Sequence, residues 1–217
     1  MVVTEEQSAG RGRRGRSWFS PPGANLLFSV LLRPPMEGDR VFTLTMILAL
    51  AAVGAVQEKN GLAVGIKWPN DLYVGTRKLA GILTEFSVRE KQVDWAVLGM
   101  GVNVSWHPEV PQGNGAPATS LLVETGHPVS RTELLVEILH RLEGFYGEIL
   151  AGGVGRLYED WNRHCLIIGR EVTVESDAET IQGRAIRIDE DGALVIEIRT
   201  GEEHRVLCGD VSLRLQS

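Results

Sequence analysis

The alternation of apolar and polar residues predicts a β-sheet in the first hundred positions of the chain. Residues 1–6 are β-leaning, and residues 25–33 form a continuous apolar run that is typical of a buried strand. Strand patterns follow at residues 66–74, 78–88 and 93–104, with short turns between them. Because short turns join consecutive strands, we expect these strands to pair in the antiparallel direction.

The longest uncharged stretch, residues 41–56, predicts a buried helix. We expect this helix over about 41–58, with Asp39 as its N-cap and the Asn60-Gly61 pair as its end. The stretch has sixteen residues, fewer than the ~20 that a membrane-spanning helix needs. We therefore expect no membrane contact.

A second helix is predicted over about 130–150, because apolar residues recur there at helical spacing. Ser130 and Glu133 form a capping box at its start. The preceding residues, 105–129, are rich in proline and glycine and are expected to form a loop.

After residue 164 the pattern changes to short β-branched runs separated by turn residues. Such runs predict a separate small β-barrel of about fifty residues, with a boundary near residue 165. The expected strands are residues 171–175, 181–188, 193–199, 204–207 and 211–215.

Composition and charge narrow the class of protein. The 217 residues are 43% hydrophobic and 23% charged, which is ordinary for a soluble globular protein and excludes a disordered or fibrous chain. With 22 basic and 28 acidic side chains the net charge is −6, so the surface as a whole is not suited to nucleic acid. The first residues lack the pattern of a signal peptide, and we expect a cytoplasmic protein.

The cysteines and histidines do not indicate a metal site. Cys165 and Cys208 lack the spacing of a zinc site or a redox pair, and we interpret both as core thiols in a reducing compartment. The five histidines contain no HExxH pair.

The segment around Gly10, Gly12 and Gly15 satisfies the GxGxxG pattern of dinucleotide-binding proteins, but the match is false. In that motif the glycine turn opens directly into a helix. Here the residues SWFSPP follow instead, and no βαβ unit surrounds them.

The same loop carries Arg11, Arg13, Arg14 and Arg16, with no acidic residue between Gln7 and Pro22. Three interpretations stay open from these residues alone: a solvated basic loop, a nucleic-acid contact, or a clamp that closes over an anionic ligand. Because like charges repel and glycine is permissive, we expect the free loop to sample many conformations.

Four segments occur in order along the chain: EEQSAGRGRRGRSWFSPPG, KWPNDL, KLAGILTE and GMGVNV. Each is weak alone, but together they resemble the catalytic core of the biotin protein ligases, over essentially the whole chain. The resemblance implies an α+β fold, with a mixed central sheet flanked by helices as in class II synthetases. It also implies two domains, a catalytic domain over 1–164 and an SH3-like β-barrel over 165–217.

The resemblance implies a biotin–[acetyl-CoA-carboxylase] ligase. Such enzymes use ATP and Mg²⁺ to convert biotin to biotinyl-5′-adenylate, and then transfer biotin to a lysine of a biotin carboxyl carrier protein. By resemblance Lys78 lies between the biotin carboxylate and the α-phosphate, Arg13 and Arg11 close over both, and Arg16 steadies the loop. Asp71 is implied as a third catalytic residue and as the contact to Mg²⁺.

Further binding residues are implied by position in the motifs. Trp18 is expected to stack on adenine, and Gly81 and Ile82 are expected to lie against the biotin ring. The other implied contacts are Gln7 and Gly10 to biotin, Asn70 to phosphate, and Asn103 and Arg214 to the nucleotide.

The family core also contains an upstream Ser-Thr-Asn-type segment that contacts biotin, and no such segment occurs here. We therefore expect a truncated family member that binds biotin weakly, and a non-catalytic biotin- or adenylate-binding or regulatory module is the alternative function. Lipoate ligation is a related alternative. No DNA-binding module is expected in this chain, and two copies could pair through an exposed first strand beginning at Val2.

Overall fold

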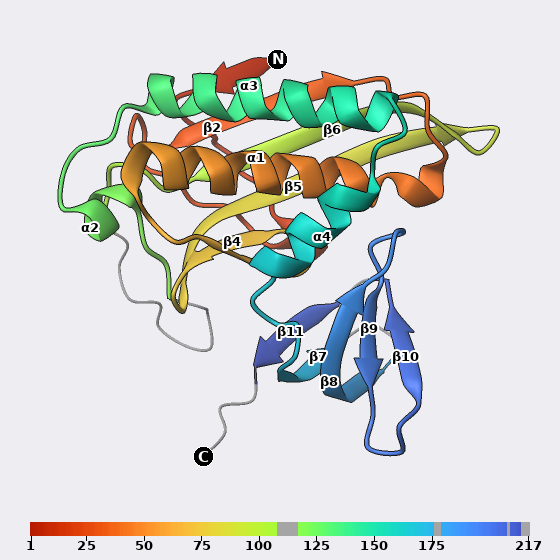
Figure 1. Cartoon of the computed structure of the whole chain (residues 1–217). Coiled ribbons are helices and arrows are strands. Elements are labelled where there is room, and N and C mark those ends of the chain that lie inside the picture. The colour runs from red at the N-terminus through yellow and green to blue at the C-terminus, as the bar shows by residue number, and fades with distance from the viewer. Residues whose placement is uncertain (108–116, 176–178, 208, 214–217) are drawn as a thin grey trace.

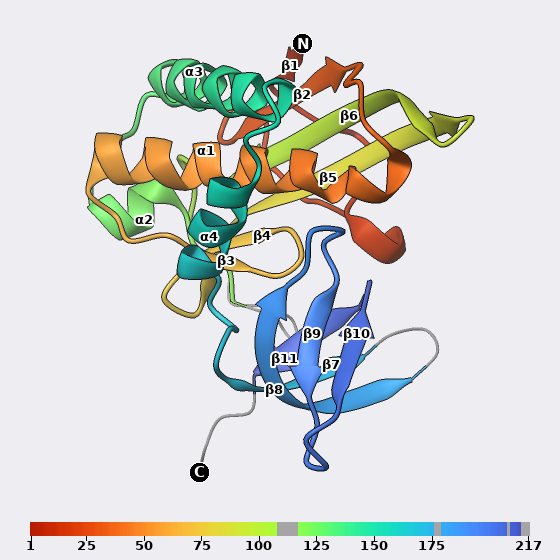
Figure 2. The same ribbon diagram turned by 45° about the vertical axis from the view of Figure 1, so that its right-hand side comes forward.

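The computed structural model describes residues 1–107, 117–175, 179–207 and 209–213, and these form two β-sheets with four α-helices (Figure 1). The larger sheet has the strand order β1-β2-β6-β5-β4-β3, and the smaller has the order β10-β9-β8-β7-β11. Figures 1 and 2 show α1 and α3 side by side over one face of the larger sheet, with the smaller sheet below it. The α+β class is confirmed.

All pairings between the strands of the larger sheet are antiparallel in the described residues, so the expected mixed sheet is wrong. The reason is local: tight turns join β4 to β5 and β5 to β6, with positive φ at Gly75, Glu90 and Lys91. The strands are β1 Val2–Thr4, β2 Leu26–Leu32, β3 Gly65–Lys67, β4 Asp71–Val74, β5 Arg77–Arg89 and β6 Gln92–Val102.

Helix α1, Phe42–Asn60, fills the centre of the molecule. It contacts β4, β5 and β6 as well as α3 and α4, which explains why its sequence is apolar on all sides. Gly61 ends the helix in the left-handed conformation (φ +67°), as predicted. The prediction for Asp39 is wrong, because Asp39 lies in a short 3-10 helix, η2 (Gly38–Arg40), and the N-cap is Val41.

Segment Gly38–Asn60 is long and apolar enough to cross a membrane, and 72% of its most apolar window is buried inside the protein. Its apolar character is accounted for by the core that it forms.

Helix α3, Arg131–Leu150, begins as predicted, with the Ser130 hydroxyl accepting a hydrogen bond from the Glu133 N–H at 3.3 Å. Two helices were not predicted: α2, Leu121–Thr125, and α4, Gly155–His164. Helix α2 lies inside the expected loop of residues 105–129 and is capped by Ser120.

The C-terminal unit consists of five antiparallel strands that match the predicted runs. Cys165, between α4 and this unit, is buried, and burial raises the pKa of its thiol, as fits the predicted core thiol. Cys208 and Arg214 lie outside the described residues. The strands are β7 Glu171–Glu175, β8 Thr180–Ile188, β9 Leu194–Glu197, β10 Glu203–Val206 and β11 Asp210–Leu213.

Shortening a buried side chain of α1 should lower the stability of the whole protein. Ile47 on α1 is 0% exposed, so Ile47→Ala should lower the free energy of unfolding by about 2–5 kcal/mol through lost burial and a residual cavity. Val136 on α3 is 62% exposed, and Val136→Ala should change it by less than about 0.5 kcal/mol. Urea denaturation followed by circular dichroism measures both, and equal losses would contradict the burial argument.

Candidate functional site

Two glycines that face each other across neighbouring strands form the floor of the site. Gly81 of β5 pairs with Gly101 of β6, and the Trp18 indole lies directly on both. A Cβ atom at Gly101 would come within 2.6 Å of Trp18 Cε2, and one at Gly81 within 3.1 Å of Trp18 Cζ3. The buried Trp18 indole N–H has no hydrogen-bond partner in the described part of the chain. Packing on bare backbone and the Lys78 ammonium, whose Nζ lies 5.5 Å from the ring centre, hold the ring.

The arginine-rich loop folds back on itself as a small hairpin. The Trp18 N–H donates to the Gly10 carbonyl at 2.9 Å, and the Gly12 N–H donates to the Arg16 carbonyl at 2.7 Å. At its tip lies the short helix η1, Arg13–Gly15, where Arg14 has φ +54°. Gly10 is required because a Cβ there would lie 2.3 Å from the Trp18 carbonyl oxygen.

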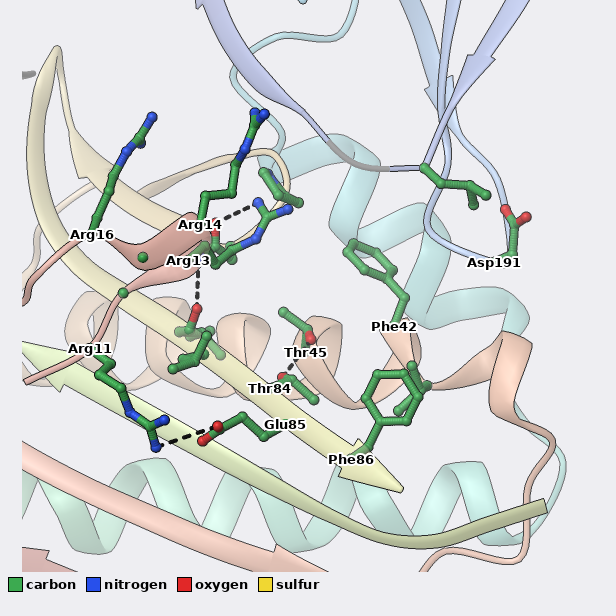
Figure 3. Close-up of a pocket in the computed structure, with 18 residues that line it drawn as sticks. Arg11, Arg13, Arg14, Arg16, Phe42, Thr45, Thr84, Glu85, Phe86 and Asp191 are labelled. Carbon is green, nitrogen blue, oxygen red and sulfur yellow. Dashed lines mark hydrogen bonds and ion pairs between the residues drawn. The ribbon is translucent and has the colours of Figure 1, made fainter. Parts of the chain in front are cut away.

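Acidic residues from other parts of the chain face the hairpin's arginines. Asp210 of β11 pairs with Arg16 and lies 3.5 Å from Arg14, and Glu85 of β5 lies 3.5 Å from Arg11. In Figure 3 Arg11 and Arg16 point in opposite directions, Arg11 toward Glu85. The repulsion expected from the loop sequence is therefore offset by charges that are distant in sequence.

The KWPND and KLAGIL segments meet the hairpin beside the glycine floor. Arg13 Nη1 donates to Asn70 Oδ1 at 3.3 Å, and the Ile82 N–H donates to the Asn70 carbonyl at 3.0 Å. Lys78 Nζ lies 2.7 Å from Asp71 Oδ2. These contacts bring together a guanidinium, an ammonium and a carboxylate from three separate segments.

Lys78 is fixed through its backbone on the side away from β4. Its N–H donates to the Pro117 carbonyl and its carbonyl accepts from the Thr119 N–H, both at 2.8 Å. The Asn103 side chain in turn donates to the Thr119 carbonyl at 3.0 Å. Asn103 is only 4% exposed, so the structure places it behind Lys78 rather than in the cavity.

Lys67 is a further cation at the site that the sequence interpretation did not single out. Burial lowers the pKa of its ammonium group, and the negative charge of Asp71 partly offsets this effect. Its Nζ lies 5.4 Å from the centre of the Tyr73 ring, and burial together with Asp71 raises the pKa of the Tyr73 hydroxyl. Its place inside the KWPND motif was the available signal.

Two cavities lie on either side of the arginine hairpin, and a third extends the glycine floor. The first, of about 560 Å³, contains most of the predicted residues. They are Arg11, Arg13, Arg16, Trp18, Asn70, Asp71, Lys78, Gly81 and Ile82. The second, of about 660 Å³, opens toward Phe42, Phe86 and Asp191 (Figure 3). The third, of about 240 Å³, includes Gln7. The predicted contact Arg214 lies outside the described residues.

The described residues contain no group of three or more histidine, cysteine, aspartate or glutamate side chains that could hold a metal ion. Asp71 is the one acidic residue of the first cavity that lies beside Lys78. A divalent ion in nucleotide sites is commonly held by one or two carboxylates together with the substrate's phosphates. Asp71 fits that pattern only as part of a site that the phosphates complete.

A cavity that is walled by the Trp18 ring and rimmed by arginine and lysine side chains is suited to a binding protein for a ligand that has a ring and an anionic group. Comparison with known families agrees with this class. Residues 1–103 match the Biotin/lipoate A/B protein ligase family, and residues 167–214 match the Biotin protein ligase C terminal domain.

Similarity to known proteins and to solved structures extends over most of the chain. The Bacillus subtilis bifunctional ligase/repressor BirA is 32% identical over 98% of this chain, which spans 66% of that relative's length. The Paracoccus denitrificans biotin–[acetyl-CoA-carboxylase] ligase is 31% identical over 93% of this chain and 85% of its own length. The structure of the Aquifex aeolicus biotin protein ligase in complex with biotin and ATP superposes with a TM-score of 0.83, at 30% identity, covering 99% of this chain and 88% of that one. The chain belongs to the biotin protein ligase family.

A side chain on the glycine floor should displace the indole. Gly101→Ala should shift the Trp18 indole N–H resonance in NMR spectra, because the new Cβ would lie within 2.6 Å of the ring. Gly99→Ala is the matched control, since its Cβ would lie 3.4 Å or more from its neighbours. The resonance is assigned by its loss in Trp18→Phe, and equal shifts in the two alanine variants would contradict the packing described.

Proposed function

We propose that this chain joins biotin to ATP as biotinyl-5′-adenylate and then transfers biotin to a lysine of a biotin carboxyl carrier protein. The observation that carries the proposal is the convergence of Arg13, Lys78 and Lys67 on one cavity beside Trp18, whose indole covers the glycine floor. A carboxylate and a phosphate repel each other, so a site that brings them together must supply positive charge.

In the first step a biotin carboxylate oxygen attacks the α-phosphorus of ATP. A new O–P bond forms, the bond to the β-phosphate oxygen breaks, and pyrophosphate leaves. Lys78 carries the charge that stabilises this transition state, because its ammonium group projects beside the floor and is oriented by Asp71 at 2.7 Å. Arg13, held by Asn70 at 3.3 Å, covers the same groups from above.

Mg²⁺, when bound with ATP, would neutralise phosphate charge, and Asp71 is the residue of the first cavity that would contact it. Trp18, which is half-buried and rests on Gly81 and Gly101, offers its ring to adenine. Gln7 lines the third cavity with Trp18, where it supports a contact to the biotin ring.

In the second step the neutral amine of the acceptor lysine attacks the acyl carbon of the adenylate. The new C–N bond replaces the C–O bond to AMP, and the amine proton passes to a base, for which Asp71 is our candidate. The second cavity shares Arg13, Asn70 and Ile82 with the first, so it offers a path for the lysine. Glu85 and Asp191 line that path and suit an approaching cation (Figure 3).

The finer assignments belong to the same proposal. We assign a catalytic domain to 1–164 and an SH3-like domain to 165–217, supported by the end of α4 at His164 and by the five-stranded order that follows. A cytoplasmic location is proposed because the apolar helix α1 is buried in the core. Contacts from Asn103 and Arg214 to the nucleotide, and pairing of two copies, stay predictions.

The direct test combines the chain with ATP, Mg²⁺, biotin and a biotin carboxyl carrier domain. Mass spectrometry should show one biotinyl group on the acceptor, and no gain when ATP or biotin is left out. An acceptor that stays unmodified while biotin still binds would favour the non-catalytic alternative.

Loss of the Lys78 ammonium should remove adenylate formation. Lys78→Ala should slow biotin-dependent pyrophosphate release about 10²–10³-fold, the typical cost of losing one group that stabilises transition-state charge. Lys59→Ala, at an exposed position in the last turn of α1, is the control and should keep the wild-type rate. More than a tenth of the rate in Lys78→Ala would overturn the assignment.

Loss of the Arg13 guanidinium should open the clamp over the adenylate. Arg13→Gly removes the contact to Asn70, so biotinyl-adenylate should leave faster and label lysines of bystander proteins. Release of adenylate from preloaded protein is measured for wild type, Arg13→Gly and the control Arg33→Gly, at an exposed position immediately after β2. Equal release from all three would show that Arg13 does not retain the intermediate.

A further inference from the structure

The turn between β8 and β9, residues 189–193, reaches from the C-terminal unit to the back of the KWPND segment. The Trp68 indole N–H donates to the Gly192 carbonyl at 2.9 Å. Trp68 is 1% exposed, so this hydrogen bond is closed off from water. A buried donor or acceptor that loses its partner costs about 1–3 kcal/mol, which makes this contact a strong constraint on both sides.

Gly192 can be only glycine in this position, for two reasons. Its φ of +86° lies in the left-handed region, and a Cβ would come within 2.2 Å of Phe42 Cγ at the start of α1. The turn is also closed internally, because the Gly192 N–H donates to the Asp189 carbonyl at 2.8 Å and the Asp189 N–H to the Ala193 carbonyl at 2.9 Å. The turn is therefore a firm surface pressed against the larger unit.

Helix α4 and α1 hold the same turn from a second direction. The Tyr158 hydroxyl donates to the Glu190 carbonyl and also lies 2.9 Å from Thr43 Oγ1. The Ile188 N–H donates to Asn162 Oδ1 at 3.3 Å. These contacts fix where the turn stands, so Trp68 is bonded to a point that α1 and α4 define.

Trp68 leads directly into the polar residues of the first cavity. Asn70, two positions later, holds Arg13 and accepts from the Ile82 N–H, and Asp71 holds Lys78. A shift of the Trp68 ring would be passed along a segment of three residues to the groups that carry charge at the site. A displacement of catalytic groups by about 1 Å is enough to slow a reaction strongly.

We propose that Trp68 is a positioning residue through which the 189–193 turn of the C-terminal unit fixes Asn70 and Asp71 in the first cavity. This inference rests on the proposed function for its effect on rate. Its structural part, the coupling of the turn to Asn70, stands without activity.

The test compares Trp68→Phe with Trp161→Phe. Trp161 is 0% exposed, packs edge-on against Phe42 with ring centres 5.4 Å apart, and its indole N–H has no hydrogen-bond partner among the described residues. Both variants therefore lose a buried indole, but only Trp68→Phe loses a hydrogen bond. Thermal unfolding of the two variants measures whether they lose the same stability, so that any further difference between them comes from the hydrogen bond.

The first measurement is hydrogen exchange at the Ile82 amide, which reports the contact to Asn70 without any substrate. Trp68→Phe should speed this exchange at least about fivefold over Trp161→Phe, as expected for a lost hydrogen bond of ordinary strength. Equal exchange in the two variants would overturn the proposal. If Trp68→Phe does not fold, Tyr158→Phe, which keeps the ring but removes the hydroxyl that donates to the Glu190 carbonyl, loosens the same turn from its other side.

The second measurement is pyrophosphate release with biotin and ATP. Trp68→Phe should lower kcat at least about fivefold and leave the KM for biotin within about twofold, because the proposed function assigns Asn70 and Asp71 to phosphate and Mg²⁺ and not to biotin. Trp161→Phe should keep both values. Activity equal in the two variants overturns the effect of this positioning on the rate. An inactive wild type contradicts the proposed function and leaves the exchange result to decide the coupling.

Discussion

The site depends on a close approach between an aromatic ring and bare backbone. Gly81 and Gly101 face each other across β5 and β6, and the Trp18 indole rests on them. Trp18 lies in one arm of the arginine hairpin, and its N–H donates to the Gly10 carbonyl of the other arm. The distance of the ring from the sheet therefore sets the distance of the guanidinium groups from the sheet. Any side chain on this floor would lift the hairpin away from Lys78.

The charge arrangement follows from that geometry. A hairpin with arginines and no acids would repel itself, but Asp210 and Glu85 approach it from the C-terminal unit and from β5. Asp210 lines the first cavity and Glu85 lines the second, so each acid lies beside the arginines that it faces. The protein can thus carry a net charge of −6 and still present a positive rim to an anionic ligand.

Much of the fold could be predicted from local sequence, because local physics decides it. Gly61 ends α1 since it can adopt positive φ, and Ser130 starts α3 since its hydroxyl bonds an unpaired N–H. Asp39 was misjudged because the chain makes an extra 3-10 turn before Val41. Helix α4 has low overall hydrophobicity and is stabilised by packing Trp161 and its neighbours into the core. The local sequence does not indicate this packing.

The site was predictable where the motif residues themselves meet, and less so where distant chain segments intervene. Arg13, Lys78 and Asp71 share one cavity as the motifs implied. The burial of Asn103 depends on Thr119, and the orientation of Arg16 depends on Asp210, so neither could be read from the motif alone. Such tertiary contacts join residues far apart in the sequence, so the helix or strand periodicity of a segment does not predict them.

Asp210 of the C-terminal unit forms ion pairs with Arg14 and Arg16 of the hairpin, so the contact between the two units and the binding of an anion use the same guanidinium groups. An anion that draws these guanidinium groups toward itself weakens their hold on the C-terminal strand by some free energy. By linkage, the free energy that anion binding takes from these ion pairs equals the free energy by which the intact pairs weaken anion binding. The small sheet is therefore a wall of the site as well as a charged partner of the hairpin, and salt, which screens these exposed pairs, acts on the contact between the two units and on the charge offered to a ligand at once.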